Sequence, residues 1–214
     1  MDSKKLLIFD FDGTLADTVP HVIHCIQKCA KHFSLKEVSY EDVEKLNGSV
    51  LADAMRALGA VDSQLPEIRK YYGEIFLEDL SDVILYDGVK EVLSQLKKDG
   101  YTLTLATNRG SNTLFPLLEF LGLKDLFTKV VCEDHVVNRK PSSEMVDLIL
   151  EEYHFQKEDT LVLGDTVFDI LMAQNAGCSS CYVCHSGNPS ENVMAMQPDF
   201  IIYRFQELVQ KSRG

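Results

Sequence analysis

Two acidic residues follow an apolar run near the start of the chain. Leu6 to Phe9 is a short apolar segment that ends at Asp10, and Asp12 and Gly13 follow closely. The run predicts a buried strand, and because alternate residues of an extended chain point the same way, the two carboxylates are expected to share one side. Carboxylates held together repel each other, and a hard cation such as Mg²⁺ removes that cost. The stretch therefore predicts a cation site at the end of a strand.

Three later segments also place polar residues directly after β-rich runs or in the loops that follow them. These are Thr107-Asn108 after residues 101–106, Lys140-Pro141 after residues 129–132, and Asp165 after residues 160–163. Each alone is an ordinary turn or exposed loop. Because ligands of parallel sheets bind beyond the carboxyl ends of the strands, Asp10, Thr107 and Asp165 are expected to gather at one edge.

The elements that must hold these residues alternate between strand and helix from residue 86 onward. Helical patterns cover residues 89–98, 113–121, 142–153, 167–176 and 204–211, and short apolar strands lie between them, at 180–183 and 200–202 as well as at the three runs above. Such alternation predicts an α/β fold in which helices cover both faces of a parallel sheet.

The segment between the first strand and the rest of the sheet is helical throughout. Apolar residues at helical spacing mark residues 19–33, and further helices are expected after Ser39, over 49–58 and over 66–80. The sequence therefore predicts a core domain made of residues 1–16 and 83–214, and a helical domain of residues 17–82 inserted into it.

The composition limits the kinds of partner that this chain can have. Hydrophobic residues make up 45% and charged residues 25%, as in ordinary globular proteins, and the net charge of -12 disfavours nucleic acid. No secretory signal and no apolar run of membrane-spanning length is visible, so a cytoplasmic protein with six reduced cysteines and no membrane partner is expected. Cys178, Cys181 and Cys184 have a metal-like spacing, but they are expected to be buried thiols because neighbouring positions of a strand face opposite ways. Monomer and homodimer both remain open.

The four polar segments together resemble a known family. The string Asp-Phe-Asp-Gly-Thr-Leu-Ala-Asp-Thr from Asp10, the pair Thr107-Asn108, the pair Lys140-Pro141, and Gly164-Asp165 with Asp169 resemble, in order, the four motifs of the haloacid dehalogenase-like hydrolases. The likeness covers essentially the whole chain. It implies a Rossmann-like core, and the helical insertion resembles the C1 cap of that family. Thr107-Asn108-Arg109 is similar to the phosphoglycolate-phosphatase-like branch.

This resemblance implies a Mg²⁺-dependent phosphatase that hydrolyses a small phosphorylated metabolite, with phosphoglycolate as the leading substrate. Asp10 would be the nucleophile that forms an aspartyl-phosphate, and Asp12 the acid and base at the leaving alcohol and the attacking water. The remaining implied roles are metal binding by Asp10, Asp12 (through its backbone carbonyl) and Asp165, support of the metal shell or of Lys140 by Asp169, phosphate binding by Thr107, Asn108 and Lys140, and substrate selection by Arg109, Gly48, Ser49 and Arg56.

Two alternatives stay open. A sugar-phosphate mutase of the same superfamily usually carries an arginine soon after the cap glycine, whereas Ser49, Val50 and Leu51 follow Gly48 here. A non-catalytic phosphate-binding or regulatory protein would be expected to lose one of the two aspartates near the start. A dehalogenase lacks the second aspartate, a phospho-receiver domain lacks the inserted helices, and a dinucleotide enzyme needs a glycine-rich first turn, so these classes are disfavoured.

Overall fold

The computed structural model describes residues 4–39 and 51–211. Six parallel strands form one sheet in the order β5-β4-β1-β6-β7-β8. Their bounds are Leu6–Phe9 for β1, Thr102–Ala106 for β4, Lys129–Val131 for β5, Thr160–Gly164 for β6, Ser179–Val183 for β7 and Phe200–Ile202 for β8. The expected α/β fold with a parallel sheet is confirmed.

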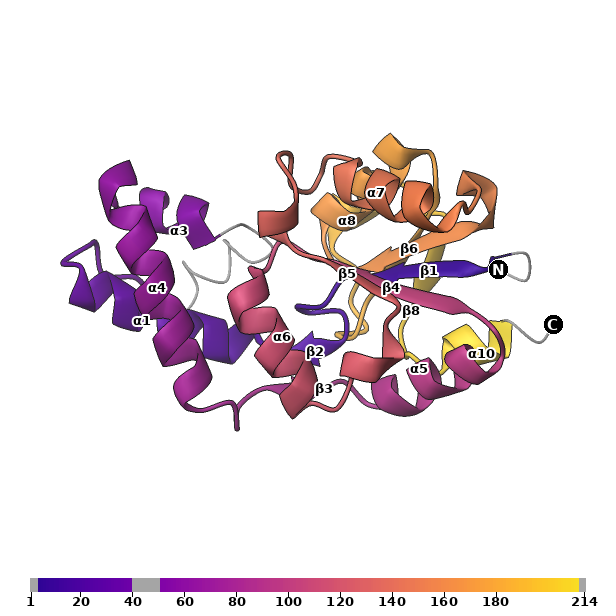
Figure 1. The fold of residues 1–214 in the computed structure, drawn as a ribbon, viewed down its shortest axis with the longest axis horizontal. Helices are drawn as coiled ribbons and strands as arrows, with labels where there is room; N and C mark the ends of the chain where they lie inside the picture. The colour runs from indigo at the N-terminus through magenta and orange to yellow at the C-terminus, as the bar shows by residue number, and fades with distance from the viewer. Residues whose placement is uncertain (1–3, 40–50, 212–214) are drawn as a thin grey trace.

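Helices cover both faces of this sheet (Figure 1). They are α5 (Val89–Lys98), α6 (Ser111–Phe120), α7 (Glu144–Tyr153), α8 (Val167–Ala176), α9 (Glu191–Ala195) and α10 (Glu207–Lys211). Strand β1 divides its four side chains between the two faces. Leu6 and Ile8 pack with residues of α7 and α8, while Leu7 and Phe9 belong to the larger core that includes α5 and α10. A strand covered on both sides must be apolar at every position, which explains the unbroken run in the sequence.

Among the described residues, three further helices between β1 and the rest of the sheet lie beyond its carboxyl end, away from both chain ends (Figure 1). They are α1 (Val19–His32), α3 (Leu51–Ala57) and α4 (Leu65–Glu78). Helices α1 and α4 pack together, and His21 on α1 contacts the carbonyl and ring of Phe76 on α4. The helix expected after Ser39 and the candidate residues Gly48 and Ser49 lie outside the described residues.

Two short strands join the helical segment to the sheet. β2 (Ala16–Asp17) pairs antiparallel with β3 (Ile84–Leu85) where the chain leaves the sheet and where it returns. This pair and α9 were not predicted from the sequence, because two-residue strands carry no alternation and α9 is little more than one helical turn. Within residues 4–39 and 51–211, no helix has the length and apolar character needed to span a membrane.

The position of α6 differs from the sequence-based expectation. The helix begins at Ser111 rather than Thr113, and it contains Pro116. Proline removes a single backbone donor, so the helix loses one hydrogen bond near its amino end and continues. The earlier start matters because it puts Asn112 and Thr113 beside the cavity described next.

Candidate active site

The carboxyl ends of three neighbouring strands bring the polar motifs together. Asp10 follows β1, Thr107 follows β4 on one side, and Asp165 follows β6 on the other. A cavity of about 100 Å³ opens at this edge, and residues of α1, α3 and α4 line its far side. Its size suits a small molecule more than a macromolecular surface.

A buried lysine ties two of the carboxylates together. Lys140 Nζ donates a hydrogen bond to Asp10 Oδ1 and another to Asp169 Oδ1, each at 2.6 Å. Burial alone would lower the pKa of Lys140, but the two carboxylates reverse this effect and raise it. Lys140 therefore stays charged at neutral pH.

The amino end of α8 holds Asp169 in place. The Thr166 backbone N–H and hydroxyl both donate to Asp169 Oδ2, at 3.0 and 2.7 Å. This reciprocal cap at a helix start also benefits from the helix dipole. A Cβ atom at Gly164 would lie 2.2 Å from Asp169 Cγ, so only glycine leaves room for this carboxylate.

A third carboxylate, that of Asp165, completes the cluster. The Thr14 hydroxyl donates to Asp165 Oδ1 at 2.8 Å. Gly13, whose φ of +79° few other residues adopt, lets Asp165 approach so closely that an added Cβ would lie 2.3 Å from its oxygen. One oxygen from each of Asp10, Asp165 and Asp169 lies within 4.8 Å of the others.

Burial, together with the nearby negative charges, raises the pKa of Asp10 and of Asp165. Burial is the main cause for Asp10, and Asp169 and Asp12 add to it against the opposing effect of Lys140, so the pKa of Asp10 rises to about 7. The pKa of Asp165 is also raised, first by removal from water and then by Asp10 and Asp169. One lysine cannot neutralise three carboxylates. The all-oxygen donor set and its excess negative charge therefore fit a hard divalent cation such as Mg²⁺.

Asp12 also lines the cavity and is bound by Arg109. Arg109 Nε lies 2.9 Å from Asp12 Oδ2, and Nη2 lies 2.6 Å from Oδ1, which is the bidentate geometry of strong arginine–carboxylate pairs. The Thr18 hydroxyl donates to the same carboxylate. The guanidinium also lies 4.4 Å from the ring centre of Phe76 on α4. Arg109 thus contacts Asp12 and the helical segment at once.

The remaining candidate residues follow β4 and β5. The Thr107 hydroxyl accepts a hydrogen bond from the Arg109 backbone N–H at 3.1 Å. Asn108 Oδ1 accepts one from the Lys140 backbone N–H at 3.2 Å. Both line the cavity, whereas Arg56 is exposed on α3 and pairs with Asp53 and Asp62. The structure therefore gathers the predicted motif residues and leaves Arg56 outside.

Several residues of the site were not found in the sequence. They are Thr14, Thr18, Arg69, Glu133 and Thr166. The spacing of Thr166 and Asp169 is a capping-box signature and could have revealed Thr166. Thr14, Arg69 and Glu133 act through contacts between distant segments, which a single sequence does not display. Thr18 contacts the nearby Asp12, and no spacing rule marks that pair.

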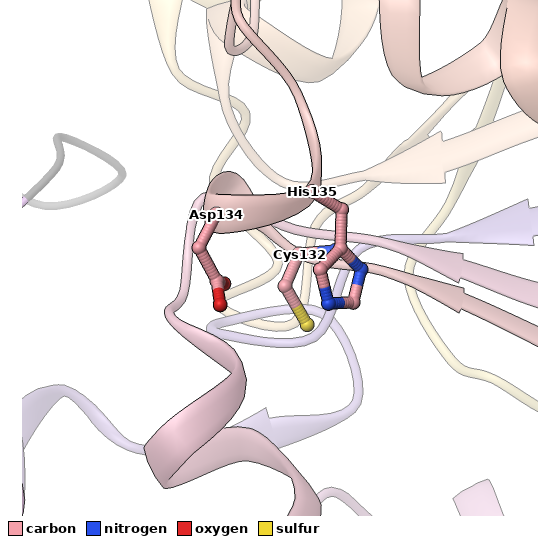
Figure 2. A group of neighbouring side chains, drawn as sticks. All are labelled: Cys132, Asp134 and His135. Atoms are coloured by element: carbon pink, nitrogen blue, oxygen red, sulfur yellow. The ribbon is translucent and has the colours of Figure 1, made fainter.

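A second group of metal-ligating residue types lies in the loop after β5. Figure 2 shows Cys132, Asp134 and His135 side by side there. The Cys132 backbone N–H donates to His135 Nδ1, and the backbone N–H and hydroxyl of Ser111 both donate to Asp134. Burial raises the pKa of the Cys132 thiol to about 12. Asp134 therefore binds the first residue of α6, while Cys132 and His135 bind each other within the loop, and a protonated thiol is a poor metal ligand.

The other cysteines are packing residues. Cys178, Cys181 and Cys184 are buried free thiols, and each belongs to a different apolar cluster. The expectation of buried thiols is confirmed.

Comparisons with known proteins agree with the geometry. The model of the haloacid dehalogenase-like hydrolases matches residues 7–183. The chain belongs to this family. It is 32% identical to a phosphoglycolate phosphatase of Vibrio cholerae over 94% of this chain and 93% of that protein. It is 30% identical to the pyrophosphatase PpaX of Listeria innocua over 95% and 94%. This chain is therefore an enzyme of the phosphatase kind.

A solved structure shares the whole fold. A Haemophilus somnus protein described as a predicted phosphoglycolate phosphatase aligns over 100% of both chains with a TM-score of 0.88 at 24% identity. At that identity the likeness concerns the fold, and it includes the helices that follow β1.

The raised pKa of Asp10 predicts how pH and Mg²⁺ affect stability. Its pKa of about 7, against 3.8 normally, means that the folded state binds the proton more tightly. The stability that this tighter proton binding contributes is fully present below about pH 4 and is lost as the pH rises through 7. A cation replaces the proton, so Mg²⁺ is expected to raise the melting temperature by roughly 4–8 °C at pH 8, about 2 kcal/mol, and far less at pH 4.5.

Thermal melting with Mg²⁺ and with chelator at both pH values checks this. Asp10→Asn should lose most of the Mg²⁺ effect, whereas the exposed control Asp125→Asn should keep it. An equal Mg²⁺ effect in Asp10→Asn would contradict the assignment of this cluster as the cation site.

Gly164→Ala tests the packing of Asp169. The added methyl would overlap the Asp169 carboxyl and displace it from Lys140, at a cost of about 2–3 kcal/mol. Gly187→Ala is the control, because that glycine has a positive φ of +74° with open space around it and costs about 1 kcal/mol of backbone strain. Urea unfolding measures both, and an equal or smaller loss in Gly164→Ala would refute this account.

Proposed function

We propose that this chain is a Mg²⁺-dependent phosphatase that hydrolyses a small phosphorylated metabolite through an aspartyl-phosphate on Asp10. The observation that carries this proposal is the cluster of Asp10, Asp165 and Asp169 around Lys140, at the mouth of a small cavity. Asp165 and one oxygen of Asp10 would hold the cation. When bound, Mg²⁺ would supply positive charge that screens the carboxylates from the phosphate dianion.

The first step would transfer the phosphoryl group to the protein. An oxygen of Asp10 attacks the phosphorus while the bond from phosphorus to the leaving oxygen breaks. Asp12 gives its proton to that leaving oxygen, which departs as an alcohol. Lys140 stabilises the charge on the phosphoryl oxygens, and Asp169 keeps its ammonium group in place.

The second step would restore the enzyme. Asp12 takes a proton from a water molecule whose oxygen attacks the phosphorus of the aspartyl-phosphate. The bond from phosphorus to the Asp10 oxygen breaks, and inorganic phosphate leaves. Thr107 and Asn108 line the cavity beside this centre and would bind the phosphate oxygens.

Residues 17–82 would act as a cap on a core made of residues 1–16 and 83–214. Side chains of α1, α3 and α4 line the cavity opposite the strand ends, and the β2–β3 pair joins the two parts. A cap of this kind excludes water and restricts the substrate to small molecules. Phosphoglycolate is the leading substrate because relatives about 30% identical carry that name. The cytoplasm suits the six free thiols.

Asp10→Asn tests the nucleophile. We expect native protein to release phosphate from phosphoglycolate with Mg²⁺ and not with chelator, and the variant to lose at least about a thousandfold in kcat, as nucleophile removal does elsewhere. Phosphate release is the measurement, with Asp125→Asn as the matched surface control. A variant that kept its activity would exclude an aspartyl-phosphate at Asp10, and native protein that only interconverted sugar phosphates would favour the mutase.

Asp12→Asn tests the acid and base. Nitrophenolate is a good leaving group and departs without being protonated. Ethanol departs only when an acid protonates its oxygen, so hydrolysis of ethyl phosphate by the variant should fall by about 10²–10⁴-fold. With 4-nitrophenyl phosphate, the variant should release a burst of nitrophenol and then turn over slowly, because water attack also needs Asp12. Rapid-mixing absorbance measures the burst. Equal losses on both substrates without a burst would argue against this role.

A further inference from the structure

Three cationic residues are among the described residues that line the cavity: Lys140, Arg109 and Arg69. Two of them are committed to carboxylates of the proposed reaction centre. Lys140 is bound to Asp10, and Arg109 is bound to Asp12. Their side chains are 2% and 5% exposed. Arg69 differs because it comes from α4, on the opposite wall.

Arg69 has hydrogen-bonding capacity left over. Its side chain is 38% exposed, and its Nη1 pairs with Oε1 of Glu133. Among the described residues, no recorded hydrogen bond or ion pair uses its Nε or Nη2. A guanidinium has five N–H donors in a planar fork, so it can bind a second anion while it keeps the first.

Glu133 fixes the position of this arginine. Its side chain is 3% exposed in the loop after β5, and its Oε2 lies 3.3 Å from Arg139 Nε without a proper hydrogen bond among the described residues. A buried carboxylate destabilises the fold unless a positive charge lies beside it. Glu133 is therefore held by its ion pairs with Arg69 and Arg139. A Cβ atom at Gly110 would lie 3.5 Å from Arg69 Nη1, so the loop that carries Thr107 to Arg109 passes directly beside Arg69.

We propose that Arg69 binds a second anionic group on the substrate, a carboxylate or a second phosphate, and thereby selects doubly anionic phosphate compounds. The inference rests on the proposed phosphatase function. The chain has a net charge of -12, and the cavity is lined by Asp10, Asp12, Asp169 and Glu133. An additional negative charge on the leaving group would be repelled there unless a cation met it, and among the described residues that line the cavity Arg69 is the cation that the reaction centre does not occupy.

The test compares three substrates in the native protein and in Arg69→Met. Phosphoglycolate and pyrophosphate carry a second anionic group, whereas ethyl phosphate has the size of phosphoglycolate without the carboxylate. We expect Arg69→Met to lower kcat/KM about 10–100-fold for at least one of the two anionic substrates, and less than about threefold for ethyl phosphate. The neighbouring exposed residue provides the control Lys70→Met, which should change none of the three.

The pattern of losses decides the matter. A loss on phosphoglycolate alone or pyrophosphate alone supports the proposal and identifies the anion. An equal loss on all three substrates, or no loss, overturns it, because Arg69 would then only join α4 to the loop after β5. If the native protein hydrolyses none of them, the proposed function fails, and calorimetry decides about Arg69 separately. Phosphoglycolate should bind the Asp10→Asn protein at least tenfold more weakly once Arg69→Met is added, and unchanged affinity would overturn the inference.

Discussion

The site depends on holding several carboxylates together where water is largely excluded. Asp10, Asp165 and Asp169 repel one another within 4.8 Å, and the charge of Lys140 offsets only part of that repulsion. The fold supplies the rest through hydrogen bonds from Thr14 and Thr166 and through the start of a helix. Two glycines let the carboxylates lie against the backbone. The cluster is thus organised in advance to receive positive charge, which is what bringing a phosphate dianion to a carboxylate nucleophile requires.

The sequence was sufficient for the sheet and for the motif residues because both follow from local rules. A four-residue apolar run can be buried on both faces only inside a sheet, and parallel strands necessarily bring Asp10, Thr107 and Asp165 to one edge. The helices were found where apolar residues recur at helical spacing. The β2–β3 pair was missed because two residues carry no period.

Contacts between distant segments were beyond the reach of the sequence. The sequence placed Arg109 beside the end of a strand. It did not show that Arg109 binds Asp12, because that pairing depends on the positions of Thr18 and Phe76. Arg69 lies in a segment whose sequence pattern predicted a helix and no functional residue. Its pairing with Glu133 depends on how α4 crosses the loop after β5, and no local pattern encodes that crossing.

These contacts connect the helical segment directly to residues of the proposed reaction centre. The Arg109 guanidinium binds the Asp12 carboxylate with its edge and lies over the Phe76 ring of α4 with its face. Any displacement of α4 therefore removes an attractive contact from the group that holds Asp12. The same helix carries Arg69, so its position affects both the proposed acid and the charge available to a substrate. If this acidic chain binds an anion as proposed, the cations fixed on the wall of one cavity provide the reason, because the nearest side chains there matter more than the overall charge of the protein.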